Sequence, residues 1–129
     1  MATLDVTLTL ASTDVSSDNL NMTVTDSLTV GPPQAGFSKL ATNVNGGADV
    51  TLHTTTTNPT YFFIKHTGFQ SDGSTSTTNI LEVKLGSNDI LRLKANEFSF
   101  LPIVTGVAVN VVSSSTQTIL VEYAYFSAA

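Results

Sequence analysis

The feature that most constrains this chain is a regular alternation of apolar and polar residues within short segments. In residues 3–10, every second residue from Leu4 to Leu10 is apolar, and threonines and one aspartate stand between them. Successive side chains of an extended strand point to opposite faces, so this period of two predicts a strand with one buried face. No segment shows a convincing helical period, and the sequence therefore predicts an all-β protein.

The same pattern recurs along the whole chain. We expect about nine or ten short strands at intervals of roughly 8–12 residues, which is typical of an antiparallel β-sandwich, with a jelly roll as the expected topology. A chain of 129 residues has the size of one domain, so residues 1–129 are expected to form a single sandwich. The expected strands cover residues 3–10, 20–30, 37–44, 48–52, 61–64, 81–85, 89–93, 96–104, 106–112 and 117–126.

Three of these segments carry further expectations. Asp26 interrupts the apolar face of residues 20–30, so we expect a β-bulge or a strand break there. The run Tyr61–Ile64 is apolar on both faces, which indicates a central strand covered on both sides. Residues 117–126 are also apolar on both faces apart from Glu122, which predicts a central strand or one at an interface.

The hairpin of residues 81–93 has a register that its own apolar pattern determines, because both strands must place their apolar side chains on one face. A three-residue loop at Gly86–Asn88 meets this condition, whereas a four-residue loop would set Val83 opposite Arg92. Asn88 tolerates the left-handed conformation that the three-residue loop needs at its end. The expected pairs are Leu81 with Leu93, Glu82 with Arg92, Val83 with Leu91 and Leu85 with Asp89.

Charge and composition exclude several classes of function. Charged residues make up 12% of the chain, the net charge is −5, and the five basic residues are scattered. Phosphate binding needs clustered cations, so we expect no nucleic-acid partner, and an anionic membrane surface is no better. No apolar run approaches the ~20 residues that span a bilayer. The start of the chain lacks a basic segment followed by an apolar one, so we expect no signal peptide.

The residues that carry chemistry are too few or too dispersed to predict an enzyme, a cofactor or a metal centre. The chain has no cysteine, and we interpret its two histidines, His53 and His66, as residues of strand surfaces. The carboxylates do not form an obvious pair, and neither a nucleophile elbow nor a phosphate-binding loop is present. One metal site stays open as an alternative, because the loop Asp14–Asn19 is rich in oxygen ligands for calcium although it lacks EF-hand spacing.

Three segments in the second half of the chain form a recognisable pattern. They are Tyr61–Gly68 (YFFIKHTG), Asp89–Pro102 (DILRLKANEFSFLP) and Val121–Phe126 (VEYAYF). This pattern resembles small virion structural proteins of tailed bacteriophages, especially those of marine phages, in which a strand ending near K-N-T-G precedes L-K-x-G-E-F-x-F-L-P. Here His66 replaces the Asn and Asn96 replaces the Gly. The resemblance covers about half of the chain and implies a role in particle assembly, as a capsid decoration protein or as part of the tail or neck.

The dispersed chemistry predicts a protein without enzymatic activity, and the resemblance implies that it is a structural protein of the virion. The leading hypothesis is a capsid decoration or cement protein that stabilises the shell through contacts with copies of itself and with other virion proteins, the major capsid protein among them. A homo-oligomer is expected, and a trimer on a lattice three-fold is one option. The interface candidates are Phe69 and Phe126, since a large apolar group in or beside a polar segment often needs a partner, and the terminal segments, Met1 and Ala129.

The alternative is a module of the tail or fibre that binds a receptor or a glycan. The polar loops 11–19 and 68–79 would carry this function, because loops at the ends of a sandwich commonly bind ligands. Three tyrosines could stack on a sugar, but they lie in dense apolar strands, which favours packing in a core or an interface. These residues are Tyr61, Tyr123 and Tyr125.

Overall fold

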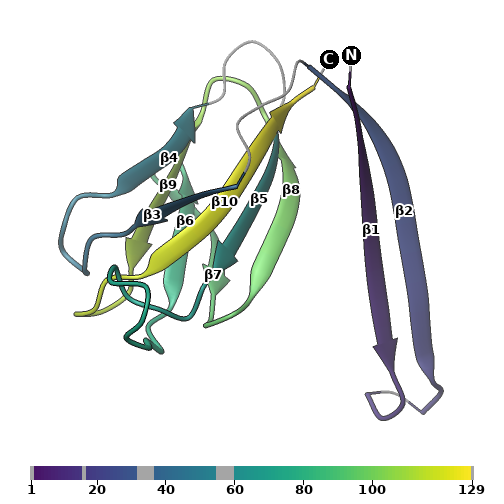
Figure 1. Ribbon diagram of the computed structural model, residues 1–129, viewed down its shortest axis with the longest axis horizontal. Helices are drawn as coiled ribbons and strands as arrows, with labels where there is room; N and C mark the ends of the chain where they lie inside the picture. The colour runs from purple at the N-terminus through teal and green to yellow at the C-terminus, as the bar shows by residue number, and fades with distance from the viewer. Residues whose placement is uncertain (1, 16, 32–36, 55–59, 129) are drawn as a thin grey trace.

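The structure is a computed structural model that describes residues 2–15, 17–31, 37–54 and 60–128. This part of the chain contains ten β-strands and no helix, which confirms the prediction of an all-β protein. Eight strands form two four-stranded sheets, and the first two strands form a separate hairpin (Figure 1). The strands are β1 (Ala2–Ser12), β2 (Leu20–Val30), β3 (Ser38–Ala41), β4 (Val50–Thr54), β5 (Thr60–His66), β6 (Leu81–Leu85), β7 (Asn88–Leu93), β8 (Phe98–Ile103), β9 (Ala108–Ser113) and β10 (Leu120–Ser127).

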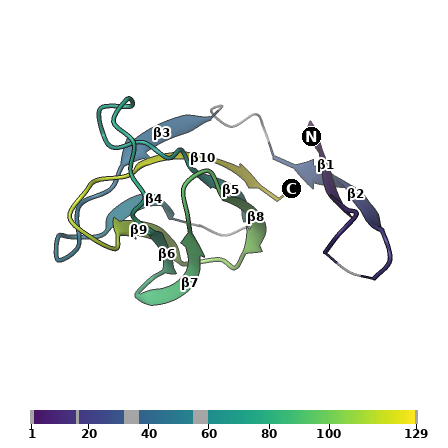
Figure 2. The ribbon, with the colours of Figure 1, turned by 90° about the horizontal axis from the view of Figure 1, so that it is seen from below.

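The two larger sheets form an antiparallel β-sandwich, as the sequence predicts. Sheet I has the strand order β3-β10-β5-β8, and sheet II has the order β4-β9-β6-β7. Figure 2 shows the two sheets as layers of one body, with the hairpin β1–β2 beside them. The pairing of strands is nested, because β3 pairs with β10, β4 with β9, β5 with β8 and β6 with β7. The chain from β3 to β10 therefore runs like one long hairpin that is folded over on itself.

The core lies between the two sheets and is built from every second residue of their strands. In β5, buried and half-buried residues alternate along the whole strand, and Phe62 and Ile64 point into the core. Full burial of one such side chain contributes roughly 1.5–3 kcal/mol. The core cluster consists of Leu52, Phe62, Ile64, Leu81, Val83, Leu93, Ile103, Val109, Val111, Ile119 and Val121.

His66 is fully buried at the end of β5, so its interpretation as a strand-surface residue is wrong. Its Nδ1 accepts a hydrogen bond from the backbone N–H of Gly68 at 2.9 Å, and its Nε2 lies 2.8 Å from the backbone carbonyl oxygen of Asn79. A backbone N–H can only donate and a carbonyl can only accept, so the proton resides on Nε2 and the ring is neutral. These two hydrogen bonds replace the ones that the ring nitrogens would form with water in the unfolded chain.

The β6–β7 hairpin confirms three of the four expected pairs and corrects the fourth. Leu85 pairs with Asn88 rather than with Asp89, and a register shift lies between Val83 and Lys84. The loop is therefore two residues long, and the bulge absorbs the extra residue. Gly86, with a φ of 61°, supplies the left-handed conformation that was expected of Asn88, because glycine adopts it without a steric penalty.

None of the described segments is a helix of the length and apolar character needed to cross a membrane.

A candidate interaction surface formed by the arm and sheet I

The arm, which we define as β1, the loop after it and β2 (residues 2–30), has one apolar and one polar face. Its strands pair antiparallel without a register shift, so opposite residues point to the same face. On the polar face the hydroxyl oxygens of Thr7 and Thr25 lie 3.5 Å apart, as do those of Thr9 and Thr23. The apolar face carries Ala2, Leu4, Val6, Leu8, Leu10, Leu20, Met22, Val24, Leu28 and Val30.

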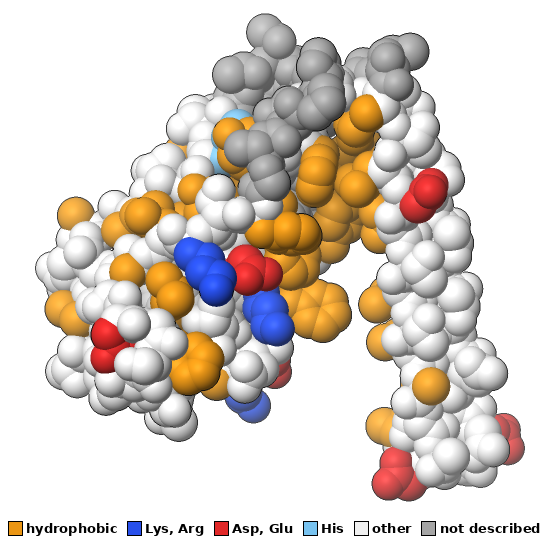
Figure 3. Space-filling model, in the orientation of Figure 1, with side chains coloured by type: hydrophobic (Ala, Val, Ile, Leu, Met, Phe, Trp, Pro, Cys, Tyr) orange, Lys and Arg blue, Asp and Glu red, His pale blue; other side chains and the backbone are white. Residues whose placement is uncertain are grey.

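The outer part of this apolar face is open to solvent. Leu8 is 44% exposed and Val24, directly opposite, is 53% exposed. Three further apolar side chains towards the tip of the arm are also exposed, namely Leu10, Leu20 and Met22. Figure 3 shows hydrophobic side chains in a row along the side of the arm that faces the sandwich. Single apolar residues scattered over a surface are ordinary, whereas a contiguous row makes this side of the arm a candidate interaction site.

Asp26 is the only charged residue on the apolar face among the described residues of the arm. The expectation of a bulge or strand break at this position is wrong, since Asp26 pairs regularly with Val6. Its Oδ1 accepts a hydrogen bond from the backbone N–H of Ser27 at 2.9 Å, and the residue is exposed. The strand can stay regular because nothing buries this part of the face, so the carboxylate keeps its water.

The arm is anchored to the sandwich at its base. The backbone N–H of Gly31 donates to the carbonyl oxygen of Ser127 at 2.8 Å, and Val30 forms an isolated bridge with Ala128. Val30 is buried, with 6% of its surface exposed. The arm therefore starts beside the end of β10, and its tip lies away from the sandwich (Figure 1).

The outer face of sheet I carries a cluster of aromatic rings, which we call the aromatic face (Phe37, Tyr61, Phe63, Phe98 and Phe100). Tyr61 and Phe100 stack with ring centroids 6.4 Å apart, and Phe63 lies 6.3 Å from Phe98 and 5.4 Å from Phe37. Two of the rings are largely uncovered, because Phe37 is 67% exposed and Phe98 is 60% exposed.

The aromatic face also corrects the expectation for residues 61–64. β5 is a central strand, between β10 and β8, as predicted. Its inner residues are covered by sheet II, but Tyr61 and Phe63 on the outer side are only half-buried. Among the described residues, no further layer covers the outer side of β5, so the expectation of cover on both sides holds for the inner face alone.

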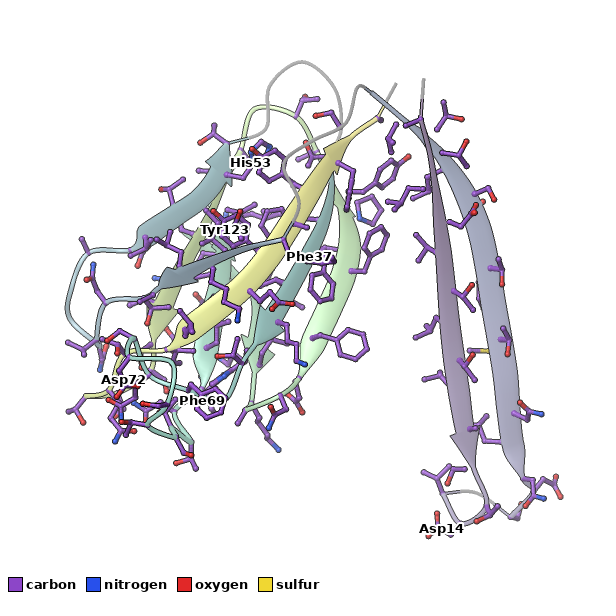
Figure 4. All side chains as sticks on the ribbon, in the orientation of Figure 1. Asp14, Phe37, His53, Phe69, Asp72 and Tyr123 are labelled. Carbon is purple, nitrogen blue, oxygen red and sulfur yellow. The ribbon has the colours of Figure 1, made fainter. Side chains whose placement is uncertain are left out.

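A groove of about 450 Å³ separates the arm from the aromatic face. Val6, Leu8 and Val24 line one wall, and Phe98 and Phe100 line the other. Figure 4 shows ring side chains of sheet I pointing across this gap toward the arm. Thr7, Asp26 and Ser99 also line the groove, so its walls are mainly apolar with one carboxylate on the side of the arm. Burial of the apolar part of both walls is favourable.

Charge is distributed unequally between the arm and the sandwich. Residues 2–30 contain four aspartates and no Lys or Arg, so the arm carries −4 of the net charge of −5. The outer face of sheet I holds two lysines, because Lys39 of β3 and Lys65 of β5 both lie opposite Glu122 of β10. Lys65 is also the register partner of Phe98. At the edge of the aromatic face, the cationic side chain of Lys65 therefore lies next to the exposed apolar surface of Phe98. Figure 3 shows Lys or Arg side chains beside hydrophobic ones in this region.

The four interface candidates from the sequence fall in different places. Phe126 lies on β10 opposite Tyr61, half-buried, so its register puts it on the outer face of sheet I. Phe69 is 39% exposed and pairs with Ser76 in a loop at one end of the sandwich, away from the arm. Met1 and Ala129 lie outside the described residues.

Sequence reasoning missed the exposed side chains of the arm and three rings of the aromatic face (Phe37, Phe98 and Phe100). Alternation in β1 and β2 looks the same whether the apolar face enters the core or stays outside it. Two signals were available in the sequence. A carboxylate at position 26 interrupts an otherwise apolar face, and the first 38 residues contain no cation.

The loops expected to bind a receptor or glycan do not meet in one site. The described residues of the loop 11–19 form the tip of the arm, whereas the loop 68–79 lies at the end of the sandwich, as the labels of Asp14 and Asp72 in Figure 4 show. In the part of the chain that the structure describes, no three His, Cys, Asp or Glu side chains gather in a way that could hold a metal ion. Asp14 instead accepts a hydrogen bond from the hydroxyl of Ser12 at 2.9 Å.

Asp72 organises the loop 68–79 from within. Its carboxylate accepts hydrogen bonds from the hydroxyl of Thr75 and from the backbone N–H groups of Ser74 and Thr75, the last two at 2.9 and 2.8 Å. These bonds favour the ionised form and lower the pKa of Asp72 to about 2, with the Thr75 hydroxyl as the largest cause. The loop is thus ordered by local hydrogen bonds although it is exposed.

His53 and the tyrosines of β10 pack with the core. The ring of His53 stacks on Tyr125 with centroids 3.9 Å apart, and Tyr123 stacks on Phe62 at 6.0 Å. Burial lowers the pKa of His53 from its usual value of 6.5. His53 is half-buried in β4, so its interpretation as a strand-surface residue is only partly correct. The two tyrosines contribute to the packing of the sandwich.

Comparison with known proteins adds no assignment to this geometry. No protein-family model matches the chain, and a search of curated proteins finds no match. The resemblance of residues 61–126 to phage virion proteins therefore stays a prediction, and the arm and sheet I are the basis for inferring a function.

Proposed function

We propose that this chain is a non-enzymatic structural protein of a virion, most simply a capsid decoration or cement protein. In this role it stabilises a shell by burying the apolar face of the arm and the aromatic face of sheet I against neighbouring subunits. One observation carries the proposal, namely the row of exposed apolar side chains on the arm, which faces a second exposed apolar surface across a groove.

The physical argument starts from the instability of an isolated hairpin. Two strands alone are marginally stable in water, and they gain stability when another element packs on their apolar face. Protein interfaces combine an apolar and aromatic centre with a polar rim. The arm has both parts, because Leu8 and Val24 lie on one face and the threonines of β1 and β2 lie on the other.

The finer topology that we propose for the sandwich is the jelly roll. The nested pairing of β3 to β10, with strands from the two halves of the chain alternating in each sheet, supports it. Jelly rolls are common in viral capsid domains and also in lectins, so the topology favours an assembly role by analogy and leaves room for glycan binding.

The segments that resemble phage virion proteins include three strands of sheet I, β5, β8 and β10. Asn96, which stands where the family has glycine, has a φ of 71°. Asparagine tolerates this left-handed conformation better than most residues, so the substitution is compatible with the same turn. The position of the pattern on the sheet with the aromatic face supports a common use of this surface.

The partners that follow from this role are copies of the same chain and other virion proteins, the major capsid protein first among them. A homo-oligomer fits the role, with a trimer at a three-fold position of the shell as one arrangement. The location that follows is the virion.

The test is a cryo-EM reconstruction of the native particle that contains this chain. We expect ordered copies at repeated positions on the shell, with the arm packed on a neighbouring subunit. A few copies on a tail or fibre, with the loops 11–19 and 68–79 facing outward, would contradict the decoration role and favour the alternative.

The alternative function is a tail or fibre module that binds a receptor or glycan. The hydrogen bonds of Asp72 favour it, because a loop that is ordered before binding loses less conformational entropy on binding. A glycan array with the full chain separates the two functions. Specific binding that Asp72→Ala abolishes would support the alternative, and a blank array together with binding to shells would support the decoration role.

A further inference from the structure

We infer that the surface that covers the arm is the aromatic face of a second copy of this chain, so that neighbouring subunits exchange arms. This inference rests on the proposed function of the arm as an assembly element. It adds the identity of the partner, the surface that receives the arm and the residues that meet. Docking of the arm on its own sheet I and docking on another virion protein are the competing arrangements.

The first argument is that the two surfaces match in chemistry. The arm offers a row of aliphatic side chains that includes Leu8, Met22 and Val24, and the aromatic face offers the uncovered rings of Phe37 and Phe98. When the apolar face of an arm lies on the rings, its threonine face points outward to water. Both copies then bury apolar surface and keep their hydroxyl groups solvated.

The second argument is charge. The arm carries four negative charges and no positive one. Lys65 and Lys39 lie on the outer face of sheet I, and Lys65 is next to Phe98. Asp26 lines the groove together with Phe98, the register partner of Lys65, so an arm that docks on the same rings of a second copy brings Asp26 towards Lys65 of that copy. A cation on the partner would compensate the charge of this single carboxylate when the apolar face around it is buried.

The third argument is the amount of surface. The large apolar side chains that are exposed on the arm and on the aromatic face of one copy are Leu8, Leu10, Leu20, Met22, Val24, Phe37 and Phe98. Exchange of two arms buries both surfaces of both copies. Specific interfaces bury roughly 1,200–2,000 Å² in total, and exchange uses the apolar surfaces of both copies together with their polar rims.

The fourth argument concerns the chain's own sheet. The groove shows that the arm does not cover the aromatic face of its own sandwich, since Phe98 is 60% exposed. The bond from Gly31 to Ser127 and the bridge of Val30 with Ala128 hold the base of the arm in this open position. The arm of one chain therefore leaves its own rings uncovered, and a second copy can offer the same rings to this arm. Exchange of identical elements is also a low-cost route to oligomers.

The test uses cysteine trapping, for which the chain is well suited because it has no cysteine of its own. Val24→Cys and Phe98→Cys are made in separate full-length chains, which are mixed under mild oxidation. We expect a mixed disulfide-linked species between the two variants. The matched control replaces Val24→Cys by Thr25→Cys, which places the thiol on the polar face of the arm, and we expect at least tenfold less of the mixed species.

The charge contact is tested by reversal. Asp26→Lys and Lys65→Asp, each alone, should weaken self-association in analytical ultracentrifugation by about two- to fivefold, the size expected of an exposed ion pair. Mixing the two variants should restore association between unlike chains. Equal association of both variants with wild-type chains and no preference in the mixture would overturn the contact between Asp26 and Lys65.

The remaining outcomes separate this inference from the proposed function. A chain that carries both cysteines and forms only a disulfide within one monomer would overturn exchange, because the arm then docks on its own sheet. Absence of any mixed species while the wild-type chain binds purified shells would overturn exchange and leave the decoration role intact. Mixed species without shell binding would support exchange and contradict the decoration role.

Discussion

Leu8 of β1 lies directly opposite Val24 of β2, and both side chains are about half exposed on the apolar face of the arm. Replacing both with threonine keeps the preference for strands but removes apolar surface. We expect the thermal unfolding midpoint to change by no more than about 4 °C, since each exposed substitution usually changes stability by less than ~0.5 kcal/mol. Self-association and shell binding should fall by at least tenfold.

The matched control for the arm is Thr7→Ser combined with Thr25→Ser on its polar face. This variant should associate and bind shells like the wild-type chain. Unchanged association of the threonine variant, measured by sedimentation velocity, would show that the apolar face of the arm is not the contact.

His66 should be the most sensitive polar residue of the sandwich. His66→Ala leaves the N–H of Gly68 and the carbonyl of Asn79 without their partner and opens a cavity at a fully buried position. We expect a loss of about 2–4 kcal/mol in the free energy of unfolding. Urea denaturation measures this loss, and a change below ~1 kcal/mol would mean that water or a rearranged loop replaces the ring.

His53 should make stability depend on pH. Burial lowers the pKa of its folded state, so at mildly acidic pH the unfolded chain binds a proton that the folded protein resists. The contribution of His53 is therefore complete above its unfolded pKa of about 6.5 and is lost as the pH falls below it. His53→Phe should flatten this part of the pH profile in urea denaturation. An unchanged slope between about pH 7 and pH 5 would contradict the role of His53.

Asp72 should act on its loop more than on the whole fold. Its carboxylate is exposed and its pKa is about 2, so the ordering that it provides is present above about pH 4 and is lost between about pH 4 and pH 2. Asp72→Ala removes the acceptor for three donors at any pH. We expect faster hydrogen exchange at residues 73–76 with little change in the global unfolding midpoint. Exchange rates equal to those of the wild-type chain would contradict this role.

Gly86 should tolerate substitution poorly although its surroundings are open. Its φ of 61° is left-handed, and no atom lies within 4 Å of a Cβ placed there. Gly86→Ala should therefore destabilise the protein by about 1–2 kcal/mol through the backbone alone. Ser87→Ala in the same two-residue loop is the control and should be nearly neutral. Equal stability of the two variants in thermal unfolding would contradict the conformational explanation.

The alternation of apolar residues was sufficient to predict the strands and the antiparallel sandwich. It also predicted the pairs Leu81–Leu93, Glu82–Arg92 and Val83–Leu91, and Arg92 lies 3.5 Å from Glu82 as a cross-strand ion pair should. These predictions hold because a shift of one residue would turn every apolar side chain to the wrong face. The bulge that shortens the loop involves one unpaired residue, and no pattern of period two can locate it.

The sequence by itself determined the strands of this protein, the two faces of each strand and the small number of its charges. Only the tertiary structure decided which apolar faces are buried. Leu8 in β1 and Leu52 in β4 occupy the same kind of alternating pattern, yet Leu52 is in the core and Leu8 faces solvent on the arm. The difference is physical, because periodicity is local to one strand, whereas burial depends on which distant segment lies on top of it.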